Sequence, residues 1–256
     1  MSAMQIAVLG QAEEGGEMSL IYEPRGKAAE YSPLAMNIYK GCAHRCVYCY
    51  APAATYNQRE AFHANVQPRN NFFQELGKDL IKFRGDKRPI LLCFTTDPYQ
   101  PIEETVKLTH YSLKKLIENG NTVKVLTKGG ARAVRDFDIM KTGNCDFGVT
   151  LTFLDEARSK EWEPGAAPPK DRLAALRVAK ESGIRTWVSL EPVIDPEQVY
   201  AIIQATHEFI DLYKVGKINY HPLSKTIDWH DFRVKVESLL TSLNKDFYIK
   251  EDLRKF

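Results

Sequence analysis

From residue 89 onward, short apolar runs alternate with amphipathic stretches, and this alternation limits the fold more than any other feature of the sequence. The runs that we interpret as strands cover residues 89–96, 122–127, 146–153, 185–194 and 209–215. Helical spacing of apolar residues lies between them, over residues 103–118, 131–140, 169–182 and 196–207. Strands separated by helices pair in parallel through right-handed crossovers. The chain is therefore predicted to be an α/β protein with a parallel sheet.

A sixth strand is predicted at the start of this series, over residues 34–40, followed by a helix over residues 72–83. Six strand–helix units favour a partial (β/α)6 TIM-like barrel over an open sheet, and 256 residues suffice for one such domain. Active sites of these barrels lie at the carboxyl ends of the strands. The loop over residues 41–52, which follows the first strand, is therefore expected on the rim of the site.

The predicted organisation has three parts. Residues 1–33 form an irregular N-terminal segment, because they are rich in Gly, Glu and Ala and contain the breakers Pro24 and Gly26. Residues 34–220 form the partial barrel. Residues 221–256, with a helix and an extended segment, close it.

Composition places the chain among ordinary globular proteins. A net charge of +2 gives no strong overall field to attract nucleic acid or an anionic membrane. The opening segment lacks the basic and apolar regions of a signal peptide, and no window reaches the length of a membrane span. Five cysteines, three of them crowded together, do not resemble a disulfide framework. We therefore expect a cytoplasmic protein in a reducing compartment, with no membrane partner.

Three cysteines lie within eight residues in the stretch GCAHRCVYCYAP, with the spacing Cys-x3-Cys-x2-Cys. Thiolates of Cys42, Cys46 and Cys49 can hold three irons of a cubane iron–sulfur cluster and leave the fourth iron open. The alternative is zinc, which usually takes four protein ligands in two separated pairs. His44 could be a fourth ligand, but it lies between two of the cysteines, where reaching the same metal would be strained. The cluster is the favoured interpretation.

These features together resemble the radical S-adenosylmethionine (SAM) superfamily, and within it the spore photoproduct lyase-like branch. The resemblance covers roughly residues 37–195 and is carried by the stretches GCAHRCVYCYAP, TTDPYQPIEE, VLTKGG, EPGAAPPKDRLAALRVAKESG and SLEPVID. It implies a partial barrel of the radical SAM type. It also implies a [4Fe-4S] cluster on Cys42, Cys46 and Cys49, with SAM on the fourth iron and an external one-electron reductant of the flavodoxin or ferredoxin type. Reduction would cleave SAM to methionine and a 5′-deoxyadenosyl radical that abstracts hydrogen from a substrate.

The resemblance also implies roles for two tyrosines beside the third cysteine. Tyr48 stands where the superfamily has an aromatic residue near the adenine of SAM, and Tyr50 where the lyase branch also has a tyrosine. Tyrosines at these positions are associated with radical transfer. The alternative is that both rings only pack over the cluster and exclude water.

Two further strand ends are implied to bind SAM. Lys128 corresponds to a lysine that contacts the SAM carboxylate, a charge-assisted pairing; the alternative is a solvated lysine. Ser189 and Glu191 alternate on one face of the fifth strand and are candidates to line the SAM pocket. Alternatively, Glu191 is only a paired carboxylate at the rim.

The segment Thr95, Thr96 and Asp97 ends the second strand, where the superfamily uses polar groups to bind the methionyl amino group. This implies a SAM-binding role for the three side chains. Asp97 precedes Pro98, so a turn residue is the alternative for that position.

Cys93 lies near the position of a cysteine that, in the lyase branch, returns a hydrogen atom to the substrate radical. The family cysteine stands three residues before its aspartate, whereas Cys93 stands four before Asp97, and Phe94 takes the family position. A shift of one residue along a strand turns a side chain to the opposite face. Cys93 is therefore a candidate hydrogen donor, with a core residue of the helix layer as the alternative. Cys145 is predicted to be structural.

Basic and aromatic residues are mixed after the cysteines, at Tyr56, Arg59, Phe62, His63 and Arg69. Such a mixture suits base stacking with phosphate contact, and equally a loop that packs over a barrel mouth. The predicted function is a radical SAM enzyme, with a damaged or modified nucleic acid base as the candidate substrate. A peptide or small metabolite is the alternative substrate. A non-catalytic, metal-stabilised nucleic-acid-binding module is the alternative from another class.

Overall fold

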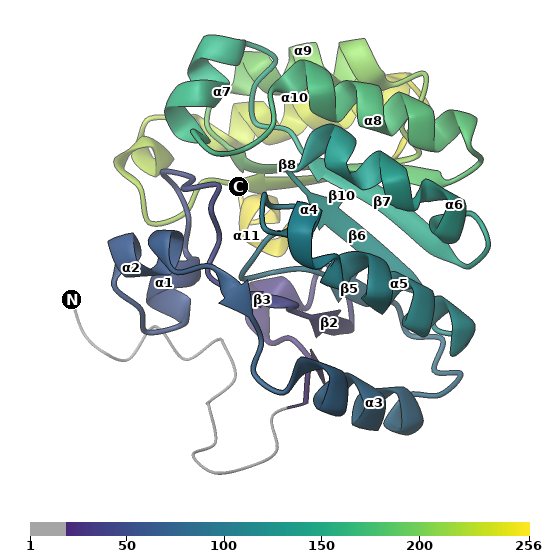
Figure 1. The fold of residues 1–256 in the computed structure, drawn as a ribbon. Helices are drawn as coiled ribbons and strands as arrows, with labels where there is room; N and C mark the ends of the chain where they lie inside the picture. The colour runs from purple at the N-terminus through teal and green to yellow at the C-terminus, as the bar shows by residue number, and fades with distance from the viewer. Residues whose placement is uncertain (1–18) are drawn as a thin grey trace.

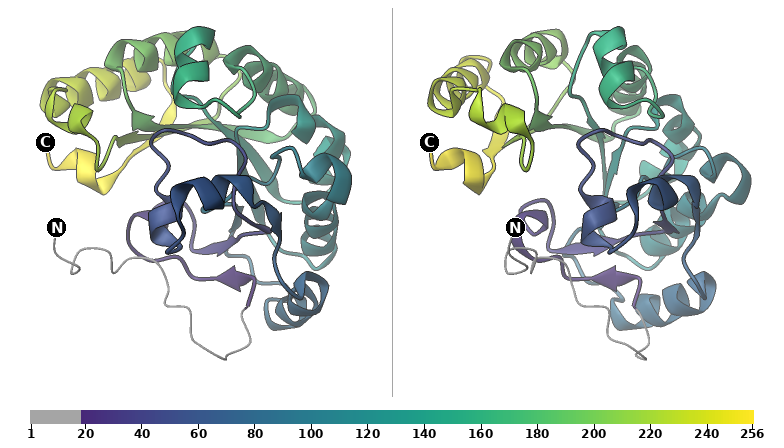
Figure 2. Two further views of the ribbon diagram at one scale, coloured as in Figure 1. Left: turned by 60° about the vertical axis from the view of Figure 1, so that its left-hand side comes forward. Right: turned by 90° about the vertical axis from the view of Figure 1, so that its left-hand side faces the viewer.

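Residues 19–256 are described by a computed structural model of the protein, in which a curved sheet carries helices on its convex face (Figures 1 and 2). The segment considered above for a signal peptide, and more than half of the predicted irregular N-terminal segment, lie outside the described residues. Among the described residues, no helix combines the length and apolar character needed to span a membrane.

Eight strands form the main sheet in the order β1-β2-β5-β6-β7-β8-β9-β10. Their bounds are β1 Ile21–Tyr22, β2 Leu34–Met36, β5 Ile90–Leu92, β6 Val123–Thr127, β7 Cys145–Thr150, β8 Arg185–Val193, β9 Leu212–Lys217 and β10 Asp246–Ile249. Neighbouring strands are parallel except for β1 and β2. The six predicted strands correspond to β2 and β5 to β9, so the predicted α/β partial barrel is confirmed.

Helices follow most strands and run along the outside of the sheet (Figure 2). The longer ones are α3 Phe72–Lys82, α5 Leu108–Glu118, α8 Pro169–Glu181, α9 Pro196–Thr206 and α10 Trp229–Ser242. The shorter ones are α1 Ala51–Ala54, α2 Arg59–Ala64, α4 Glu103–Val106, α6 Phe137–Met140, α7 Glu156–Trp162 and α11 Glu251–Arg254. A second sheet pairs β3 (Tyr39–Lys40) with β4 (Gln67–Pro68).

Two separate clusters of side chains show which face of the sheet each residue occupies. The large cluster joins strand residues such as Val125 and Val188 to helix residues such as Leu176, so it lies between sheet and helices. The small cluster contains no helix residue and lies on the concave face; its buried members are Tyr31, Ala35, Leu91 and Trp187. Opposite faces of a strand therefore serve different layers, as the period-2 geometry requires.

The concave face is filled by aromatic side chains rather than left as a channel. Trp187 is 2% exposed, and its indole lies across Gly148 of the neighbouring strand. A Cβ on Gly148 would lie 2.2 Å from the indole ring, so only glycine permits this packing. Tyr31 and the half-buried Phe94 pack edge to face in the same cluster, with ring centroids 5.9 Å apart.

Several predicted elements differ in detail from the structure. The predicted helix over residues 103–118 is divided into α4 and α5, because Lys107 has a left-handed backbone with φ 53°. The first helical turns predicted over residues 131–140 are a 3-10 helix, Gly130–Asp136. Residues 56–71, between the cysteine loop and the predicted helix over residues 72–83, contain α2 and β4. Local periodicity did not indicate α2 or α7 because both are short.

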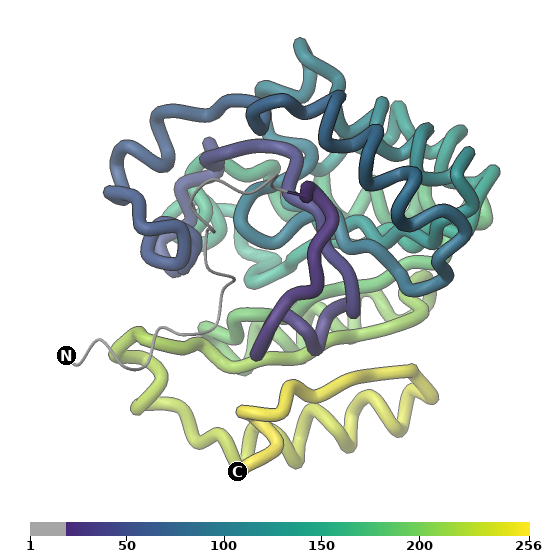
Figure 3. The backbone as a smooth tube through the Cα atoms, turned by 90° about the horizontal axis from the view of Figure 1, so that it is seen from below, coloured from purple at the N-terminus to yellow at the C-terminus, as the bar shows by residue number. Residues whose placement is uncertain are grey.

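Side chains bridge the open side of the barrel. The segment before β2 lies beside β9 and β10 (Figure 3). Lys214 Nζ donates to the carbonyl oxygens of Glu30 and Tyr31, at 3.0 Å each. Lys250 Nζ lies 3.5 Å from the carboxylates of Glu30 and Glu191. Two buried ammonium groups are tolerated here because each has oxygen partners.

Candidate active site

The cysteine loop, residues 41–52, begins with a turn that requires glycine and ends in α1. Gly41 has φ 75°, and a Cβ on it would lie 2.5 Å from the carbonyl oxygen of Phe62. The loop follows β3 at the mouth of the barrel, where the short helices α1 and α2 cover it (Figure 2). It therefore lies on the predicted rim.

Three unpaired thiols are the main chemical feature of this loop. Cys42, Cys46 and Cys49 form no disulfide, and Cys46 is 7% exposed. Burial raises the pKa of Cys46 to about 12 and also raises the pKa of the other two thiols. Three thiolates in this place therefore need a positive partner, which a metal centre supplies.

Helix α2 holds the backbone of the cysteine loop from one side. The Arg59 guanidinium donates to the carbonyl oxygens of Cys46, Val47 and Cys49, at 2.5, 2.8 and 3.2 Å. His63 Nδ1 lies 2.7 Å from the Cys42 carbonyl oxygen, and because a carbonyl only accepts, Nδ1 carries the hydrogen. Helix α2 thus binds carbonyl oxygens of the loop, while its three thiols form no disulfide.

The segment between β5 and α4 holds the loop from a second side. Thr96 Oγ1 donates to the Gly41 carbonyl oxygen at 2.7 Å, and Gln100 Nε2 donates to Thr96 Oγ1 at 2.8 Å. The backbone N–H of Ala43 donates to Gln100 Oε1 at 2.9 Å. Gln100 is fully buried, and its side-chain amide fixes the backbone next to the first cysteine, Cys42.

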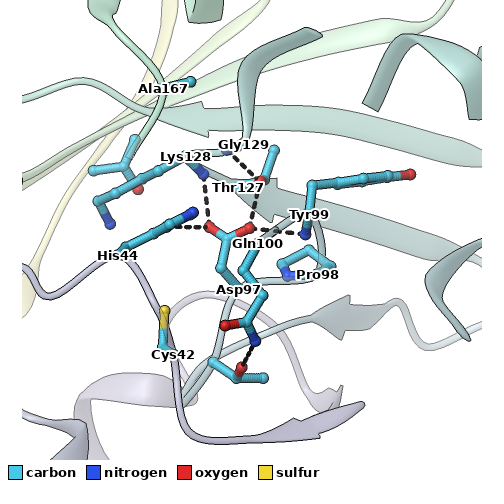
Figure 4. A network of polar contacts seen from close by, with 12 residues as sticks. Cys42, His44, Asp97, Pro98, Tyr99, Gln100, Thr127, Lys128, Gly129 and Ala167 are labelled. Atoms are coloured by element: carbon cyan, nitrogen blue, oxygen red, sulfur yellow. Dashed lines mark hydrogen bonds and ion pairs between the residues drawn. The ribbon is translucent and has the colours of Figure 1, made fainter. Parts of the chain in front are cut away.

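Asp97 lies at the centre of the contacts in Figure 4, between the end of β6 and the cysteine loop. Its carboxylate accepts from Thr127 Oγ1 at 2.6 Å and from the backbone N–H groups of Lys128 and Tyr99, at 2.7 and 2.9 Å. His44 Nδ1 lies 3.4 Å from the other side of the same carboxylate. A carboxylate has about four lone-pair sites. Through these contacts Asp97 forms a turn with Tyr99 and joins the end of β6 to the cysteine loop. A contact between Asp97 and SAM stays a prediction.

His44 is fully buried rather than exposed to solvent, with 1% of its surface accessible. Burial lowers its pKa to about 4, although Asp97 acts in the opposite direction. The imidazole is therefore neutral at physiological pH. It braces the loop against Asp97.

A buried ion pair between Glu163 and Arg172 holds the cysteine loop from a third side, through Tyr48. The Tyr48 hydroxyl donates to Glu163, and Arg172 Nη1 lies 2.6 Å from the other oxygen of that carboxylate. Arg172 also donates to the carbonyl oxygens of Ala167 and Thr150, at 2.7 and 2.9 Å. Both charged side chains are at most 1% exposed. The orientation of Tyr48 is therefore fixed by a pair that solvent does not reach.

The segment carrying Glu163 is also joined to the cysteine loop by its backbone. Val47 N–H donates to the Trp162 carbonyl oxygen at 2.8 Å, and Gly165 N–H donates to that of His44 at 2.9 Å. A Cβ on Gly165 would lie 2.2 Å from the carbonyl oxygen of Ala43. Only glycine allows the two segments to approach this closely.

Lys128 ends β6 beside Tyr48, with Nζ 5.6 Å from the ring centroid. Burial disfavours its charge, but Cys46, Glu163 and Asp97 outweigh burial and raise its pKa. Among the described residues, no oxygen forms a hydrogen bond or ion pair with its Nζ, and none bonds the hydroxyl of half-buried Thr95. Both groups are therefore open to a ligand.

Ser189 and Glu191 project from β8 toward the bridged side of the barrel. The Tyr31 hydroxyl lies 2.7 Å from Ser189 Oγ and 2.5 Å from Glu191 Oε2. Glu191 also lies beside Lys250, so it is a paired carboxylate in this structure. Their predicted contact with SAM stays a prediction.

The structure places Cys93 and Tyr50 in different surroundings. Cys93 is 4% exposed and packs in the large cluster between sheet and helices, whereas Phe94 belongs to the concave cluster. The hydrogen-donor role of Cys93 therefore receives no support from its position. Tyr50 is 47% exposed at the mouth, with its hydroxyl 3.1 Å from the Phe94 carbonyl oxygen. Cys145 is buried in the large cluster, where a structural residue is expected; its structural role stays a prediction.

The mixture of basic and aromatic residues after the cysteines does not form one exposed surface. Phe62 and His63 are 5% and 7% exposed, and Arg59 is engaged with the cysteine loop. Tyr56, in contrast, is 85% exposed. Most of this predicted nucleic-acid patch therefore supports the loop instead.

The donor set fits an iron–sulfur cluster better than a single metal ion. Within residues 19–256, no three His, Cys, Asp or Glu side chains are grouped to hold one ion. Cysteines of a cubane cluster bind different irons, so they lie further apart than ligands of one ion. Three soft thiols on a loop fixed from three sides meet that requirement.

Sequence reasoning missed several residues of this site. Arg59, Gln100 and Glu163 contact the loop across 10 to 115 residues of sequence. Gln100 and Glu163 lie within the stretches TTDPYQPIEE and EPGAAPPKDRLAALRVAKESG, but no local pattern shows what they contact. For Arg59 the sequence left nucleic-acid contact and packing over the barrel mouth equally open, because its helix was not predicted.

Comparison with known proteins agrees with this geometry. Residues 36–210 match the family model described as the radical SAM superfamily. An uncharacterised protein of Methanocaldococcus jannaschii is 31% identical over 188 residues, which cover 72% of this chain and 70% of that protein. An uncharacterised protein of Mycobacterium tuberculosis is 28% identical over 62% of this chain, and the match spans about half (49%) of its own length.

Solved structures share the fold at low sequence identity. Spore photoproduct lyase complexed with dinucleoside spore photoproduct aligns with a TM-score of 0.68 and 12% identity, over 88% of this chain and 78% of the lyase. SuiB of Streptococcus suis bound to S-adenosylmethionine aligns with a TM-score of 0.61 and 16% identity, over 84% of this chain and 50% of SuiB. The family model covers well over half of the sequence, and this chain therefore belongs to the radical SAM superfamily.

Proposed function

We propose that Cys42, Cys46 and Cys49 hold a [4Fe-4S] cluster whose fourth iron binds SAM, and that the enzyme abstracts hydrogen from a nucleic acid substrate. The observation that carries the first part is the cysteine loop itself. Its carbonyls and N–H groups are bound by Arg59, Gln100 and other neighbours, while its three thiols form no disulfide. When bound, the cluster would supply the electron that cleaves SAM to methionine and a 5′-deoxyadenosyl radical.

The residues of the chain bind and orient SAM in this proposal. Lys128 provides a charged donor for the SAM carboxylate, and the open hydroxyl of Thr95 a further polar contact. Tyr48, fixed through Glu163, covers the cluster side of the pocket. The filled concave face excludes water from below, which protects a reactive radical.

The same filled face supports a substrate that approaches from outside. Trp187, Tyr31 and Phe94 occupy the space beneath the mouth, so the reacting group must be presented at the rim. Tyr56 and Tyr220 are 85% and 90% exposed on rim loops, where a base could stack on them. A nucleic acid fits this arrangement, and spore photoproduct lyase, which shares the fold, has been solved with a dinucleoside photoproduct.

The test of the cofactor proposal is anaerobic reconstitution with iron and sulfide. Reduction with dithionite in the presence of SAM should release 5′-deoxyadenosine. Alanine at Cys42, Cys46 or Cys49 should abolish both four-iron content and cleavage, while Cys145→Ala, a matched buried thiol, should change neither. A four-iron cluster that survives any of the three replacements would show that the ligands are assigned wrongly.

The test of the substrate proposal uses isotope transfer. Deuterated single-stranded DNA or RNA is incubated with reduced enzyme and SAM, and deuterium is measured in the 5′-deoxyadenosine. Transfer from either nucleic acid supports the proposal. Transfer only from a deuterated peptide would replace it with the alternative substrate.

A further inference from the structure

An open cavity of about 630 Å³ lies against the cysteine loop, and no residue of the concave face lines it. The lining residues used below are Ala43, Arg45, His63, Val66, Ile102 and Gly165. Ala43 is bonded directly to Cys42, and Arg45 directly to Cys46. The cavity therefore lies against the loop backbone beside Cys42 and Cys46, although neither cysteine lines it.

One wall of the cavity contains a buried polar atom without a partner. His63 is 7% exposed, and its Nε2 forms no hydrogen bond with any described residue. Its Nδ1–H is held by the Cys42 carbonyl oxygen, so the ring is fixed and Nε2 is left as an acceptor. A buried acceptor without a donor costs free energy unless something outside the chain satisfies it.

The remaining walls combine apolar side chains with cations. Val66 and Ile102 provide the apolar surface, and Arg45 is exposed beside them. Lys160 does not line the cavity, but its Nζ donates to the carbonyl oxygen of Pro164, which does, at 2.7 Å. An apolar centre with a charged rim is the usual anatomy of a protein interface.

A third cation lies next to the same wall. Lys40 pairs with Gln67 in the small sheet, directly after Val66. Within residues 19–256, none of Lys40, Arg45 and Lys160 has an acidic side chain within 4 Å. The rim therefore offers positive charge that the described chain does not neutralise, which suits an acidic partner.

We propose that this cavity is the docking surface for the protein that reduces the enzyme, an acidic one-electron carrier of the flavodoxin or ferredoxin type. This inference rests on the proposed cluster. One electron leaves the reduced carrier and enters the cluster, and no bond or proton is transferred. Redox partners typically form small, weak, electrostatically guided contacts, which a shallow cavity with a cationic rim provides. Substrate at the mouth and carrier at the cavity would not compete for the same surface.

The experiment compares two reductants on the reconstituted holoenzyme. Arg45→Glu and Lys160→Glu reverse charges at the cavity. Arg84→Glu is the matched control, because Arg84 is exposed between α3 and β5, at the opposite end of the barrel. Arg45→Lys keeps the charge. For each variant, the Kd for purified flavodoxin is measured at several salt concentrations, and cluster reduction is followed with reduced flavodoxin and with dithionite.

Each reversal at the cavity should weaken flavodoxin binding about three- to tenfold at low salt, with the difference shrinking as salt rises. Flavodoxin-driven reduction should slow accordingly, while dithionite-driven reduction and SAM cleavage stay unchanged. Arg84→Glu and Arg45→Lys should behave like the wild type. Equal slowing with both reductants, or no change with either, would overturn the docking assignment. Failure of dithionite to support SAM cleavage in the wild type would instead refute the proposed function. The Kd values for flavodoxin would still show whether the carrier binds at the cavity.

Discussion

Replacing Arg172 by methionine should destabilise the protein strongly, because it leaves Glu163 buried beside Tyr48 without its ion-pair partner. Burial alone raises the pKa of Glu163, but the charges of Arg172 and Lys128 and the Tyr48 hydroxyl lower it below its ordinary value. Breaking a buried pair by removing one partner costs about 3–5 kcal/mol. For a chain of this size each kcal/mol lowers Tm by about 2–4 °C, so the expected fall is about 6–20 °C.

The stability that Arg172→Met loses relative to the wild type should depend on pH in a defined direction. In the wild type the folded pKa of Glu163 lies below the unfolded value, so its stabilisation is complete above the unfolded pKa and is lost only as pH falls through the folded pKa. Without Arg172, burial dominates and the folded pKa rises above the unfolded value. The variant then loses stability as pH rises through that raised pKa. Its deficit relative to the wild type should therefore be smaller at pH 5.5 than at pH 7.5.

Thermal unfolding of cluster-free protein at both pH values measures this effect. Glu163→Gln and the double variant Glu163→Gln/Arg172→Met complete a double-mutant cycle. The double variant should be more stable than Arg172→Met alone, because a neutral amide replaces the unpaired charge. A single-variant loss below about 1 kcal/mol, or losses that simply add in the double variant, would refute the reasoning, since paired neighbours should not be additive.

Three further changes test other contacts. Gly165→Ala should lower the iron content after reconstitution, because its Cβ would lie 2.2 Å from the Ala43 carbonyl oxygen. Gly77→Ala is the control, because a Cβ there would meet no atom within 4 Å; it should stabilise α3 by about 0.5–1 kcal/mol. Lys128→Met should raise the Kd for SAM about ten- to hundredfold in equilibrium dialysis with iron content unchanged, and an unaltered Kd would remove Lys128 from the pocket. Burial, reinforced by neighbouring lysines, lowers the pKa of Lys214 to about 8, below the unfolded value, so urea unfolding should show stability rising between pH 8 and 10. Lys214→Met should flatten that rise, and an unchanged slope would contradict the burial argument.

The cysteine motif and the arrangement of strands and helices in layers could be predicted largely from local sequence. Three thiols within eight residues are close in any fold, and the alternation of strand and helix patterns predicts parallel pairing without any knowledge of contacts. The six predicted strands correspond to β2 and β5 to β9 for this reason. Even the turn position of Asp97 was open to sequence reasoning, because its side chain bonds the N–H of Tyr99 only two residues away.

Tertiary structure decided which side chains are free to act. Phe94 lies on the concave face and Cys93 in the helix layer, a difference set by how one strand is placed in the sheet. Glu191 is occupied by Lys250, which comes from the far end of the chain. Arg59, for which nucleic-acid contact and packing over the barrel mouth were both open, binds the carbonyls of the cysteine loop. Each outcome depends on contacts between separate elements, whereas periodicity and motif spacing report only on neighbours along the chain.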